Sequence, residues 1–328
     1  MTVRVGVIGL GIGRTHLVHL RALRDVEIVA VADVVGQVAT DLGAHYGAKP
    51  YTDALAMLNA EKLDAVTICT PPKYHRELTL AAAERGMHIL CEKPMAPSLA
   101  DCDAMIEATS KAGVTLMIGF KKRYGPQFAY LKDKEAEWGQ PRTILYRYQL
   151  GPVAKDWFWD EQDGGGPLVE NTAHCFDMLR NLFGDAKTVY AETSNFFTKT
   201  HKVDIAEAVF TIRFKSGATA AVAAGAAGVW AYDESERLMI SYDSANVELS
   251  GKFDAPRQMR IIGRKATDVV VKTFDNPDGF PFELAAFIDC VRGQATPRAT
   301  GIDGKKALQL SLAVKESGRT GRPVQIGD

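Results

Sequence analysis

Cysteine is scarce in this sequence, and the few cysteines form no recognisable motif. The five are an odd, scattered set without a CxxC pair: Cys69, Cys91, Cys102, Cys175 and Cys290. This pattern argues against a disulfide framework and against a cysteine-based zinc site. It is typical of a reducing compartment, so we expect a cytoplasmic protein.

The sequence also lacks a hydrophobic run long enough to cross a bilayer. The most apolar stretch, residues 218–231, consists mostly of alanine and glycine and falls short of the roughly 20 residues that a spanning helix needs. The amino terminus has neither the basic segment nor the small-residue cleavage site of a secretory signal. We therefore expect no membrane partner.

An excess of charge of either sign is absent as well. Lys and Arg total 39 against 40 Asp and Glu, for a net charge of −1. No basic field exists to hold phosphate backbones, so we expect no nucleic-acid partner. The chain is 46% hydrophobic and 24% charged, which excludes a disordered or collagen-like protein. Its 328 residues favour two domains over one.

Short β-branched runs alternate with segments of helical period through about residue 120. The strands predicted there are residues 3–8, 26–32, 65–69, 88–91 and 114–118. Strands that alternate with helices in this way are typical of α/β folds with a doubly wound parallel sheet. Domains of this kind commonly bind dinucleotides at the carboxyl ends of their strands, so we assign residues 1–122 to a Rossmann domain that we expect to bind NAD(P).

The pattern changes after Tyr124, and strands with alternating polarity dominate after residue 186. They are predicted at residues 206–214, 219–224, 237–242, 246–249, 259–262 and 268–273. This favours an α+β domain over residues 123–328 with a large open, mostly antiparallel sheet. We expect Phe210, Ile212 and Phe214 on a sheet face that one helix layer cannot cover, and hence a homodimer or homotetramer. We expect that the last helical segment can pack back on the first domain.

A glycine-rich turn follows the first predicted strand: Gly9, Gly11 and Gly13, with Leu10 and Ile12 between them. Glycines at such a turn let the backbone approach a pyrophosphate, which then lies at the helix amino terminus. The usual spacing is G-x-G-x-x-G, whereas here the third glycine comes one residue early. The alternative is a turn that serves close packing only.

Asp33 ends the second predicted strand, where a Rossmann acid bonds the ribose hydroxyls. The alternative is an aspartate that caps a turn. The carboxylate should repel the 2′-phosphate of NADP, and Val34, Val35 and Gly36 offer no cation to bind that phosphate. We therefore expect NAD as the cofactor.

Glu92 and Lys93 follow the strand at residues 88–91. Ligands of open parallel sheets bind at the carboxyl ends of the strands, so Lys93 is expected to point into the cleft there. A lysine can donate a hydrogen bond to a substrate hydroxyl or carbonyl oxygen. A solvated surface lysine is the ordinary alternative.

Three glycines at 164–166 precede a predicted helix over residues 168–183 that carries Glu170 and His174. These two are i and i+4 and share a helix face, which Asp177 continues. They are either a solvated polar stripe or a carboxylate–histidine pair in which His174 accepts a hydroxyl proton near neutral pH. The pair could also suggest a metal site, but spacing places no third ligand, and we expect no metal.

Aromatic rings beside carboxylates occur at 156–160, where Trp157 and Trp159 lie between Asp156 and Asp160. Such rings suit a polyhydroxylated ring, although aromatic clusters are usually part of a core. Arg123 follows the strand at 114–118, so we expect its side chain to reach the ligand cleft. The alternative is that the basic run around it is a solvated surface.

Together these motifs resemble the Gfo/Idh/MocA (glucose–fructose oxidoreductase/inositol dehydrogenase) family. The resemblance covers nearly the whole chain, with several motifs in family order. The matching stretches are VGVIGLGIGRTHL (5–17), AVADV (30–34), DAVTICTPPKYH (64–75), CEKPMA (91–96), IGFKKRYGP (118–126), GGGPLVENTAHCFDMLRNLFG (164–184) and KESGRTGRPV (315–324).

The resemblance implies a role for individual residues. Lys93 is the lysine beside the nicotinamide, and His174 is the proton acceptor of an Asp-x-x-x-His pair in which Glu170 replaces the usual Asp. The predicted catalytic residues are thus Lys93, His174 and Glu170. The predicted cofactor-binding residues are Gly9, Gly11, Ile12, Gly13, Asp33, Thr70, Pro71, Pro72, His75, Glu92 and Lys93. The predicted substrate-binding residues are Arg123, Trp157, Trp159, Asn171 and His174.

Three functions compete at this stage. The first is an NAD-dependent dehydrogenase that acts on a secondary hydroxyl of a sugar, inositol or sugar acid. The second is a redox-assisted glycoside-cleaving enzyme, which oxidises its substrate transiently and retains the hydride. The third is a non-catalytic NAD- or sugar-sensing regulator, which would be expected to lack Lys93 or His174. Net formation of NADH separates the first from the second.

Overall fold

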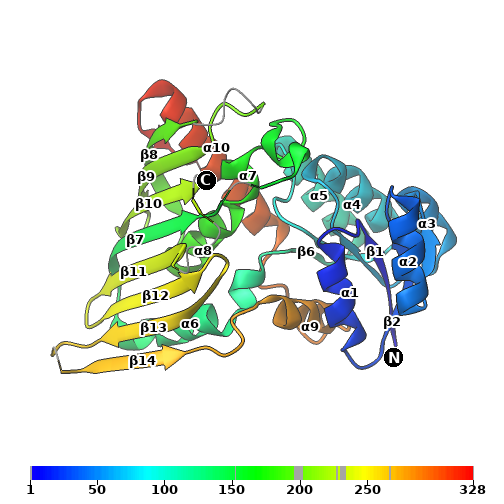
Figure 1. Ribbon diagram of the computed structural model, residues 1–328, viewed down its shortest axis with the longest axis horizontal. Coiled ribbons are helices and arrows are strands. Elements are labelled where there is room, and N and C mark those ends of the chain that lie inside the picture. Colours follow the sequence, from blue (N-terminus) through cyan, green and yellow to red (C-terminus); the bar gives the residue numbers. More distant parts are fainter. Residues whose placement is uncertain are drawn as a thin grey trace. The chain divides into compact units, whose positions relative to one another are not determined.

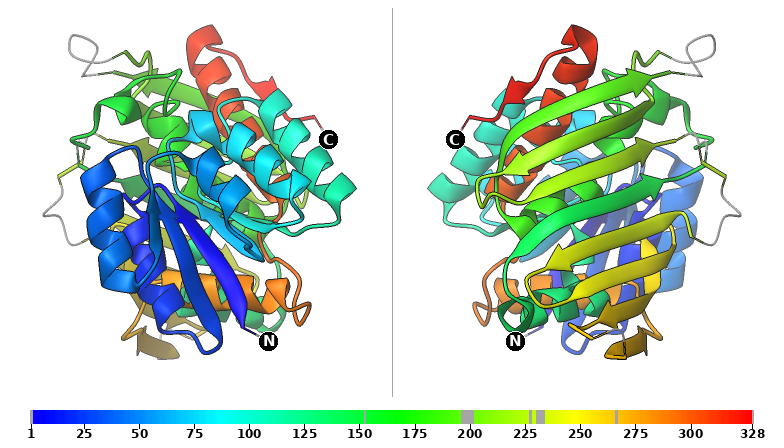
Figure 2. Two further views of the ribbon diagram at one scale, coloured as in Figure 1. Left: turned by 90° about the vertical axis from the view of Figure 1, so that its right-hand side faces the viewer. Right: turned by 90° about the vertical axis from the view of Figure 1, so that its left-hand side faces the viewer.

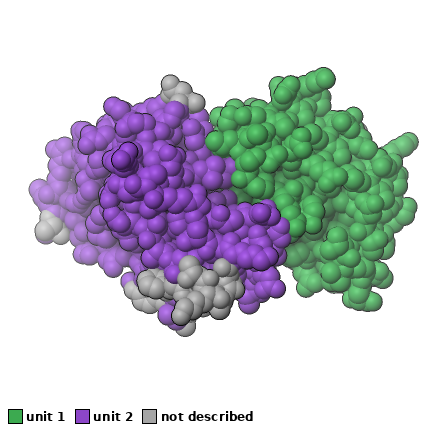
Figure 3. All heavy atoms as spheres, turned by 90° about the horizontal axis from the view of Figure 1, so that it is seen from above, with its two compact units in different colours: residues 1–121, 280–305 green, residues 122–279, 306–328 purple. Residues whose placement is uncertain are grey.

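The computed structural model describes residues 2–151, 153–195, 202–226, 228–229, 234–265 and 267–327. The chain divides into two compact units, which Figure 3 shows in different colours. Unit 1 comprises residues 1–121 and 280–305, and unit 2 comprises residues 122–279 and 306–328. The segment 280–305 therefore belongs to the same unit as residues 1–121.

Unit 1 contains a parallel sheet with the strand order β3-β2-β1-β4-β5-β6 in the described part of the chain. The order reverses between β1 and β4, which makes the carboxyl ends of these two strands the switch point where ligands of such sheets bind. The strands are β1 (Val3–Ile8), β2 (Val26–Ala32), β3 (Lys49–Tyr51), β4 (Ala65–Ile68), β5 (His88–Cys91) and β6 (Leu116–Ile118). The predicted doubly wound Rossmann sheet is confirmed.

Helices connect these strands and have recognisable caps. Ser98 accepts a hydrogen bond from the Asp101 amide at the start of α5, and Asp53 caps α3 in the same way. Gly113 ends α5 in the left-handed conformation. The helices are α1 (Gly13–Arg21), α2 (Gly36–Tyr46), α3 (Ala54–Ala60), α4 (His75–Glu84), α5 (Leu99–Ala112) and α9 (Phe280–Val291), with the 3₁₀ turn η1 (Pro72–Tyr74).

Unit 2 contains a mixed sheet with the order β14-β13-β12-β11-β7-β10-β9-β8-β15 among the described residues. Only its β7–β10 pair is parallel there, so the predicted mostly antiparallel sheet is confirmed. The strands are β7 (Pro141–Gln149), β8 (Ala186–Ser194), β9 (Glu207–Phe214), β10 (Thr219–Gly225), β11 (Glu236–Tyr242), β12 (Asn246–Lys252), β13 (Ala255–Ile262), β14 (Val269–Thr273) and β15 (Val324–Gln325).

Helices of unit 2 lie on one face of this sheet, as Figure 1 shows. They are α6 (Pro126–Trp138), α7 (Pro167–Glu170), α8 (Ala173–Phe183) and α10 (Gly301–Thr320), which starts in unit 1; the 3₁₀ turns are η2 (Lys121–Tyr124) and η3 (Asp156–Trp159). Phe210 and Phe214 pack under them, with ring centroids 5.5 Å from Phe176 and 5.7 Å from Phe183.

The other face of the sheet is open among the described residues. The right-hand view of Figure 2 looks onto it, with no described helix of unit 2 in front. This corrects the prediction that Phe210, Ile212 and Phe214 form the uncovered face, because all three are buried on the helix side. Their neighbours along the strands point the other way. The exposed apolar residues of this face include Leu145, Tyr190, Val209 and Met239.

The predicted single helix over 168–183 is in fact two helices, α7 and α8. The break falls at Asn171–Thr172, where the amides of both residues donate to the Pro167 carbonyl oxygen. The Thr172 hydroxyl donates to the same oxygen over 3.2 Å. Side-chain bonding of this kind competes with regular helix geometry.

None of the helices in the described segments combines the length and the apolar character needed to span a membrane. The apolar stretch 218–231 contributes β10, as a strand in the middle of the sheet. Ala227, Trp230 and Ala231 of that stretch lie outside the described residues.

Candidate active site

The glycine turn of unit 1 has the geometry of a pyrophosphate cradle. Gly9 has φ +83°, and a Cβ there would lie 2.7 Å from the Cys69 carbonyl group, so only glycine fits. A Cβ on Gly13 would lie 3.1 Å from a Val7 methyl group, which lets α1 start close to β1. A Cβ on Gly11 would meet nothing within 4 Å. The Gly11 backbone therefore borders open space beside the amino terminus of α1, which fits a bound pyrophosphate.

Asp33 ties the end of β2 to this turn. Its Oδ2 accepts the Leu10 amide over 2.7 Å, and its Oδ1 accepts the Val35 amide over 2.9 Å. The carboxylate is partly exposed, and each oxygen has a further lone pair. The position therefore suits the ribose hydroxyls of a dinucleotide that lies on the glycine turn.

The segment from Thr70 to His75 follows β4 and carries η1. The His75 ring is fully buried, with Nε2 2.8 Å from the Thr70 carbonyl oxygen and Nδ1 3.1 Å from the Pro94 carbonyl oxygen. Burial lowers the pKa of His75, against the opposing effect of these carbonyl groups. The imidazole thus holds the Thr70 loop to the Pro94 loop. The Thr70 hydroxyl oxygen has no hydrogen-bond partner among the described residues.

Lys93 is the second residue after β5 and is half-buried, and the Glu92 carboxylate holds its backbone. Glu92 Oε2 accepts the Lys93 amide over 3.1 Å, and Oε1 lies 2.9 Å from His16 Nε2. Both oxygens of this buried carboxylate therefore contact the protein itself. Neither the strand pattern nor the motifs single out His16.

In unit 2, His174 lies near the start of α8 and is 6% exposed, and Glu170 ends α7 and is half-buried. The glycine run sets the entry to α7: Gly165 and Gly166 have φ +78° and +77°, and a Cβ on either would lie within 2.8 Å of a valine side chain. Helix α10 also contacts α7, because the Ser311 hydroxyl donates to the Leu168 carbonyl oxygen over 2.7 Å.

Asn171 lies between the two, at the junction of α7 and α8. It is 6% exposed, and its Nδ2 has no hydrogen-bond partner among the described residues. A buried amide donor of this kind needs an acceptor, since an unpaired buried donor costs about 1–3 kcal/mol. A substrate hydroxyl is a suitable acceptor.

Arg123 joins α8 through Asp177. Its Nε and one terminal nitrogen contact the two Asp177 oxygens over 2.8 and 2.6 Å, and both side chains are buried. The basic run 121–123 is therefore not simply a solvated face. The sequence places Asp177 on the polar stripe of the predicted helix, but does not name it as the partner of Arg123.

The neighbouring Lys122 forms a second buried ion pair. Its Nζ lies 2.6 Å from Glu236 Oε1 and 3.3 Å from Asp254 Oδ1. Tyr146 donates to Glu236 over 2.7 Å. Burial raises the pKa of Glu236, and the Lys122 ammonium opposes that effect. Sequence reasoning missed this network, because Glu236 and Lys122 occur in patterns that ordinarily indicate exposed positions.

The two units match two domain families. Residues 3–120 match the family described as "Oxidoreductase family, NAD-binding Rossmann fold", and residues 134–267 match the "GFO/IDH/MocA C-terminal domain". The chain belongs to the Gfo/Idh/MocA family.

Two relatives of this Gfo/Idh/MocA protein are similar along nearly their whole length. Myo-inositol 2-dehydrogenase of Thermotoga maritima is 30% identical over 98% of each chain. Scyllo-inositol 2-dehydrogenase (NAD(+)) of Bacillus subtilis is 28% identical over 99% of this chain and 96% of its own. The structure of levoglucosan dehydrogenase in complex with NADH and levoglucosan superimposes with a TM-score of 0.90 at 21% identity and full coverage of both chains. The expected family and enzyme class are thereby confirmed: the protein is an oxidoreductase that uses NAD.

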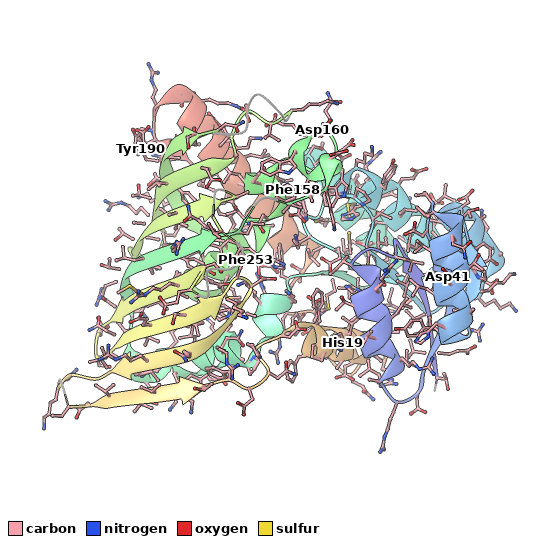
Figure 4. All side chains as sticks on the ribbon, viewed as in Figure 1. His19, Asp41, Phe158, Asp160, Tyr190 and Phe253 are labelled. Carbon is pink, nitrogen blue, oxygen red and sulfur yellow. The ribbon has the colours of Figure 1, made fainter. Side chains whose placement is uncertain are left out.

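The two tryptophans predicted to bind substrate, Trp157 and Trp159, differ in their exposure and their contacts. Trp159 is 3% exposed, its indole N–H donates to the Val153 carbonyl oxygen over 2.7 Å, and it packs in a cluster with Phe158 and, at its edge, Phe253 (Figure 4). Trp157 is half-buried at the edge of the same cluster. These contacts assign Trp159 to the core of unit 2 and leave only Trp157 partly accessible.

Proposed function

We propose that this NAD-dependent oxidoreductase oxidises a secondary hydroxyl of an inositol, sugar or sugar acid, with Lys93, His174 and Glu170 as its catalytic residues. The proposal is supported by the surroundings of the two residues that we assign to proton transfer. Glu92 holds the Lys93 backbone at the end of β5, and His174 is buried at the start of α8.

The proposed roles follow from the chemistry of each side chain. When bound, NAD supplies the acceptor for the hydride. The His174 imidazole takes the hydroxyl proton, since histidine changes charge near neutral pH. The Lys93 ammonium donates a hydrogen bond to the same oxygen and stabilises the negative charge that develops there.

Glu170 and Asn171 complete the substrate side of the proposal. The Glu170 side chain is one methylene longer than the usual aspartate, and we assign it the task of orienting His174 or contacting a substrate hydroxyl. Asn171 Nδ2 donates to a second hydroxyl. Arg123, which Asp177 holds in place, contacts a substrate hydroxyl, and Trp157 supplies a flat apolar surface.

We divide the predicted cofactor-binding residues into those that contact NAD directly and those that act through other residues. Gly9, Gly11, Ile12 and Gly13 contact the pyrophosphate, and Asp33 contacts the ribose. Thr70, Pro71 and Pro72 border the nicotinamide half. We assign His75 and Glu92 an indirect role, because their polar atoms contact the loops that carry Thr70 and Lys93.

A panel of inositols, sugars and sugar acids tests this function when each is incubated with enzyme and NAD. We expect at least one compound to give net NADH, read by its near-ultraviolet absorbance, with an oxidised ketone or lactone product. Cleavage of a glycoside without net NADH would instead support the redox-assisted reaction. A panel that gives neither NADH nor cleavage would contradict the proposal.

We further propose that the protein works as a cytoplasmic homodimer or homotetramer whose copies meet at the open face of the unit 2 sheet. Leu145, Tyr190, Val209 and Met239 are exposed on this face, beside a shallow hollow of about 410 Å³ that Pro323 borders. Apolar strands exposed in this way favour association. The five cysteines are unpaired and buried, which suits a reducing compartment.

A further inference from the structure

His16 is a buried polar residue for which the proposed reaction has no use. It lies on α1, directly after the glycine turn, and is 0% exposed. Figure 4 labels His19, which lies one turn further along the same helix. A buried imidazole is costly unless its nitrogens are satisfied, so its partners indicate what it does.

The partners of His16 lie at the carboxyl ends of two strands of unit 1. His16 Nε2 is 2.9 Å from Glu92 Oε1, and Nδ1 is 3.5 Å from Cys69 Sγ. Cys69 follows β4 directly and precedes the Thr70 loop, and Glu92 follows β5 directly. His16 thus connects the helix of the cofactor turn with both loops that border the proposed nicotinamide site.

Glu92 carries this connection to Lys93. While Oε1 contacts His16, Oε2 accepts the Lys93 amide over 3.1 Å. On its other side the carboxylate lies against Gly119, where a Cβ would come within 3.0 Å of Oε2. The carboxylate therefore has little freedom to move while His16 is present.

The charges around His16 favour a short, strong contact with Glu92. Burial alone would lower the pKa of His16, but Cys69 and Glu92 raise it to about 10. Burial raises the pKa of Cys69, which the neighbouring His16 opposes, and the Glu92 carboxylate is the second acidic group against the imidazole. Charge-assisted hydrogen bonds are about twice as strong as neutral ones.

Two residues of α9, Glu283 and Phe280, also face the pair. Glu283 has a carboxylate oxygen within 4.8 Å of the His16 and Glu92 ligand atoms. The Phe280 ring packs against the His16 ring at 5.7 Å, and Lys121 Nζ lies 4.3 Å from the centroid of Phe280. His16, Glu92, Phe280 and Glu283 all belong to unit 1.

We propose that His16 is a positioning residue that fixes the Glu92 carboxylate and, through it, the backbone from which Lys93 acts. This inference rests on the proposed catalytic role of Lys93. It assigns His16 no contact with substrate or NAD. Misplacing a catalytic group by about 1 Å can cost roughly 100-fold in rate, so loss of His16 should lower turnover more than it weakens binding.

The test compares two substitutions of His16. In His16→Gln the amide nitrogen reaches close to the position of Nε2 and still donates to Glu92, whereas His16→Leu has similar bulk and no donor. We expect His16→Leu to lower kcat by roughly 30- to 100-fold, with substrate KM and NAD affinity (by calorimetry) within about threefold of wild type. His16→Gln should recover kcat to within about fivefold.

A second pair of variants keeps the test valid if His16→Leu does not fold. His16→Asn is polar, but its amide reaches the position of Nδ1 and not Nε2, so it should lose turnover while His16→Gln does not. His45→Leu and His45→Gln are the controls, since His45 is an exposed histidine on α2 of the same unit. Both should behave like wild type.

Several outcomes would overturn the inference. Wild-type kcat in His16→Leu or His16→Asn would do so, as would equal losses in the leucine and glutamine variants. A loss of NAD affinity with unchanged kcat would assign His16 to the cofactor turn alone. A stoichiometric metal ion in the purified protein, whose removal stops turnover, would make His16, Glu92 and Glu283 ligands instead.

The proposed function is tested separately by Lys93→Ala. If Lys93→Ala keeps wild-type turnover, the catalytic role of Lys93 is wrong, whatever the His16 variants show. If Lys93→Ala loses turnover but His16→Leu does not, only the positioning role is wrong.

Discussion

At the scale of single residues, carboxylates hold backbone amides at the places where the cofactor and substrate are expected. Asp33 accepts two amides, one of them from the glycine turn, and Glu92 accepts the amide of Lys93. Bonds from a charged acceptor to an amide are worth about 1.5–3 kcal/mol each, so such residues fix loops firmly. A substitution that removes one such bond should loosen the loop that it holds, and so change function, before it unfolds the whole protein.

The charge of Asp33 should set the preference for NAD over NADP. Asp33→Asn keeps an oxygen that can accept a backbone amide but loses the negative charge that repels the 2′-phosphate. We expect the ratio of kcat/KM for NAD to that for NADP to fall by about tenfold or more. Asp41→Asn, at an exposed position on α2, is the matched control (Figure 4). Comparable kcat/KM for the two cofactors in the wild type would contradict this role.

His16 should make stability depend on pH above neutrality. Its pKa is raised to about 10 in the folded state, against 6.5 as the ordinary value. Its stabilising contribution is therefore complete below pH 6.5 and is lost as the pH rises toward 10. We expect the difference in unfolding free energy between wild type and His16→Gln, measured in urea, to shrink by a few kcal/mol over that range. A constant difference would show that the histidine is neutral throughout.

The motifs predict residues that depend on local backbone geometry, and they miss pairs that form across the fold. Gly9 and Asp33 are predictable because a strand, a tight turn and a helix occur in a fixed order. The Lys122–Glu236 pair is not, since the two residues are far apart in sequence and each lies in a pattern typical of exposed residues. Trp159 resembles a ligand-stacking ring in sequence and is a core residue in the structure.

At the scale of elements, α10 holds two loops near the helices that carry Glu170 and His174. Lys315 is 5% exposed and contacts Glu161, which follows η3, and also Asp204, which precedes β9, at 3.5 Å. Arg319, one turn later, contacts the same two carboxylates. Lys315 lowers the pKa of Asp204, together with Glu161 and Arg319, although burial opposes the shift.

Removing the buried ammonium should loosen this connection. We expect Lys315→Met to lower the unfolding free energy by about 1–2 kcal/mol, less than for a fully buried pair, since Glu161 and Asp204 remain partly exposed and keep Arg319. Lys202→Met is the control: Lys202 pairs with Asp160 (Figure 4) but its side chain is 84% exposed, so its loss should cost at most about 0.5 kcal/mol. Equal losses in the two variants would contradict the connecting role of α10.

Prediction of elements succeeds where apolar runs have clear boundaries, and fails where a side chain interrupts a regular pattern. The strands β1, β2 and β5 begin and end as predicted, because apolar runs with clear boundaries define them. The break between α7 and α8 depends on a Thr172 hydroxyl bond that no periodicity reveals. The strand β3 is too short to give an alternating pattern.

At the scale of the whole molecule, the open sheet face of unit 2 should control assembly. Val209, the third residue of β9, is 61% exposed, and a charge there would oppose a second copy. We expect wild type to be a dimer or tetramer by light scattering at micromolar concentration, and Val209→Asp to lower the mass to that of a smaller assembly. Ile302→Asp, at an exposed apolar position of unit 1, should not change it. A monomeric wild-type protein would contradict the proposed assembly.

The central claim is that Lys93 and His174 carry the chemistry of this NAD-dependent oxidoreductase. The most direct measurement is the turnover of Lys93→Ala and His174→Ala on the best substrate of the panel, with NAD affinity measured separately by calorimetry. We expect each variant to lose at least roughly 100-fold in kcat while NAD still binds, and Glu170→Ala to lose less. Near-wild-type turnover in His174→Ala would contradict the account, and would leave Lys93 as the candidate acid–base group.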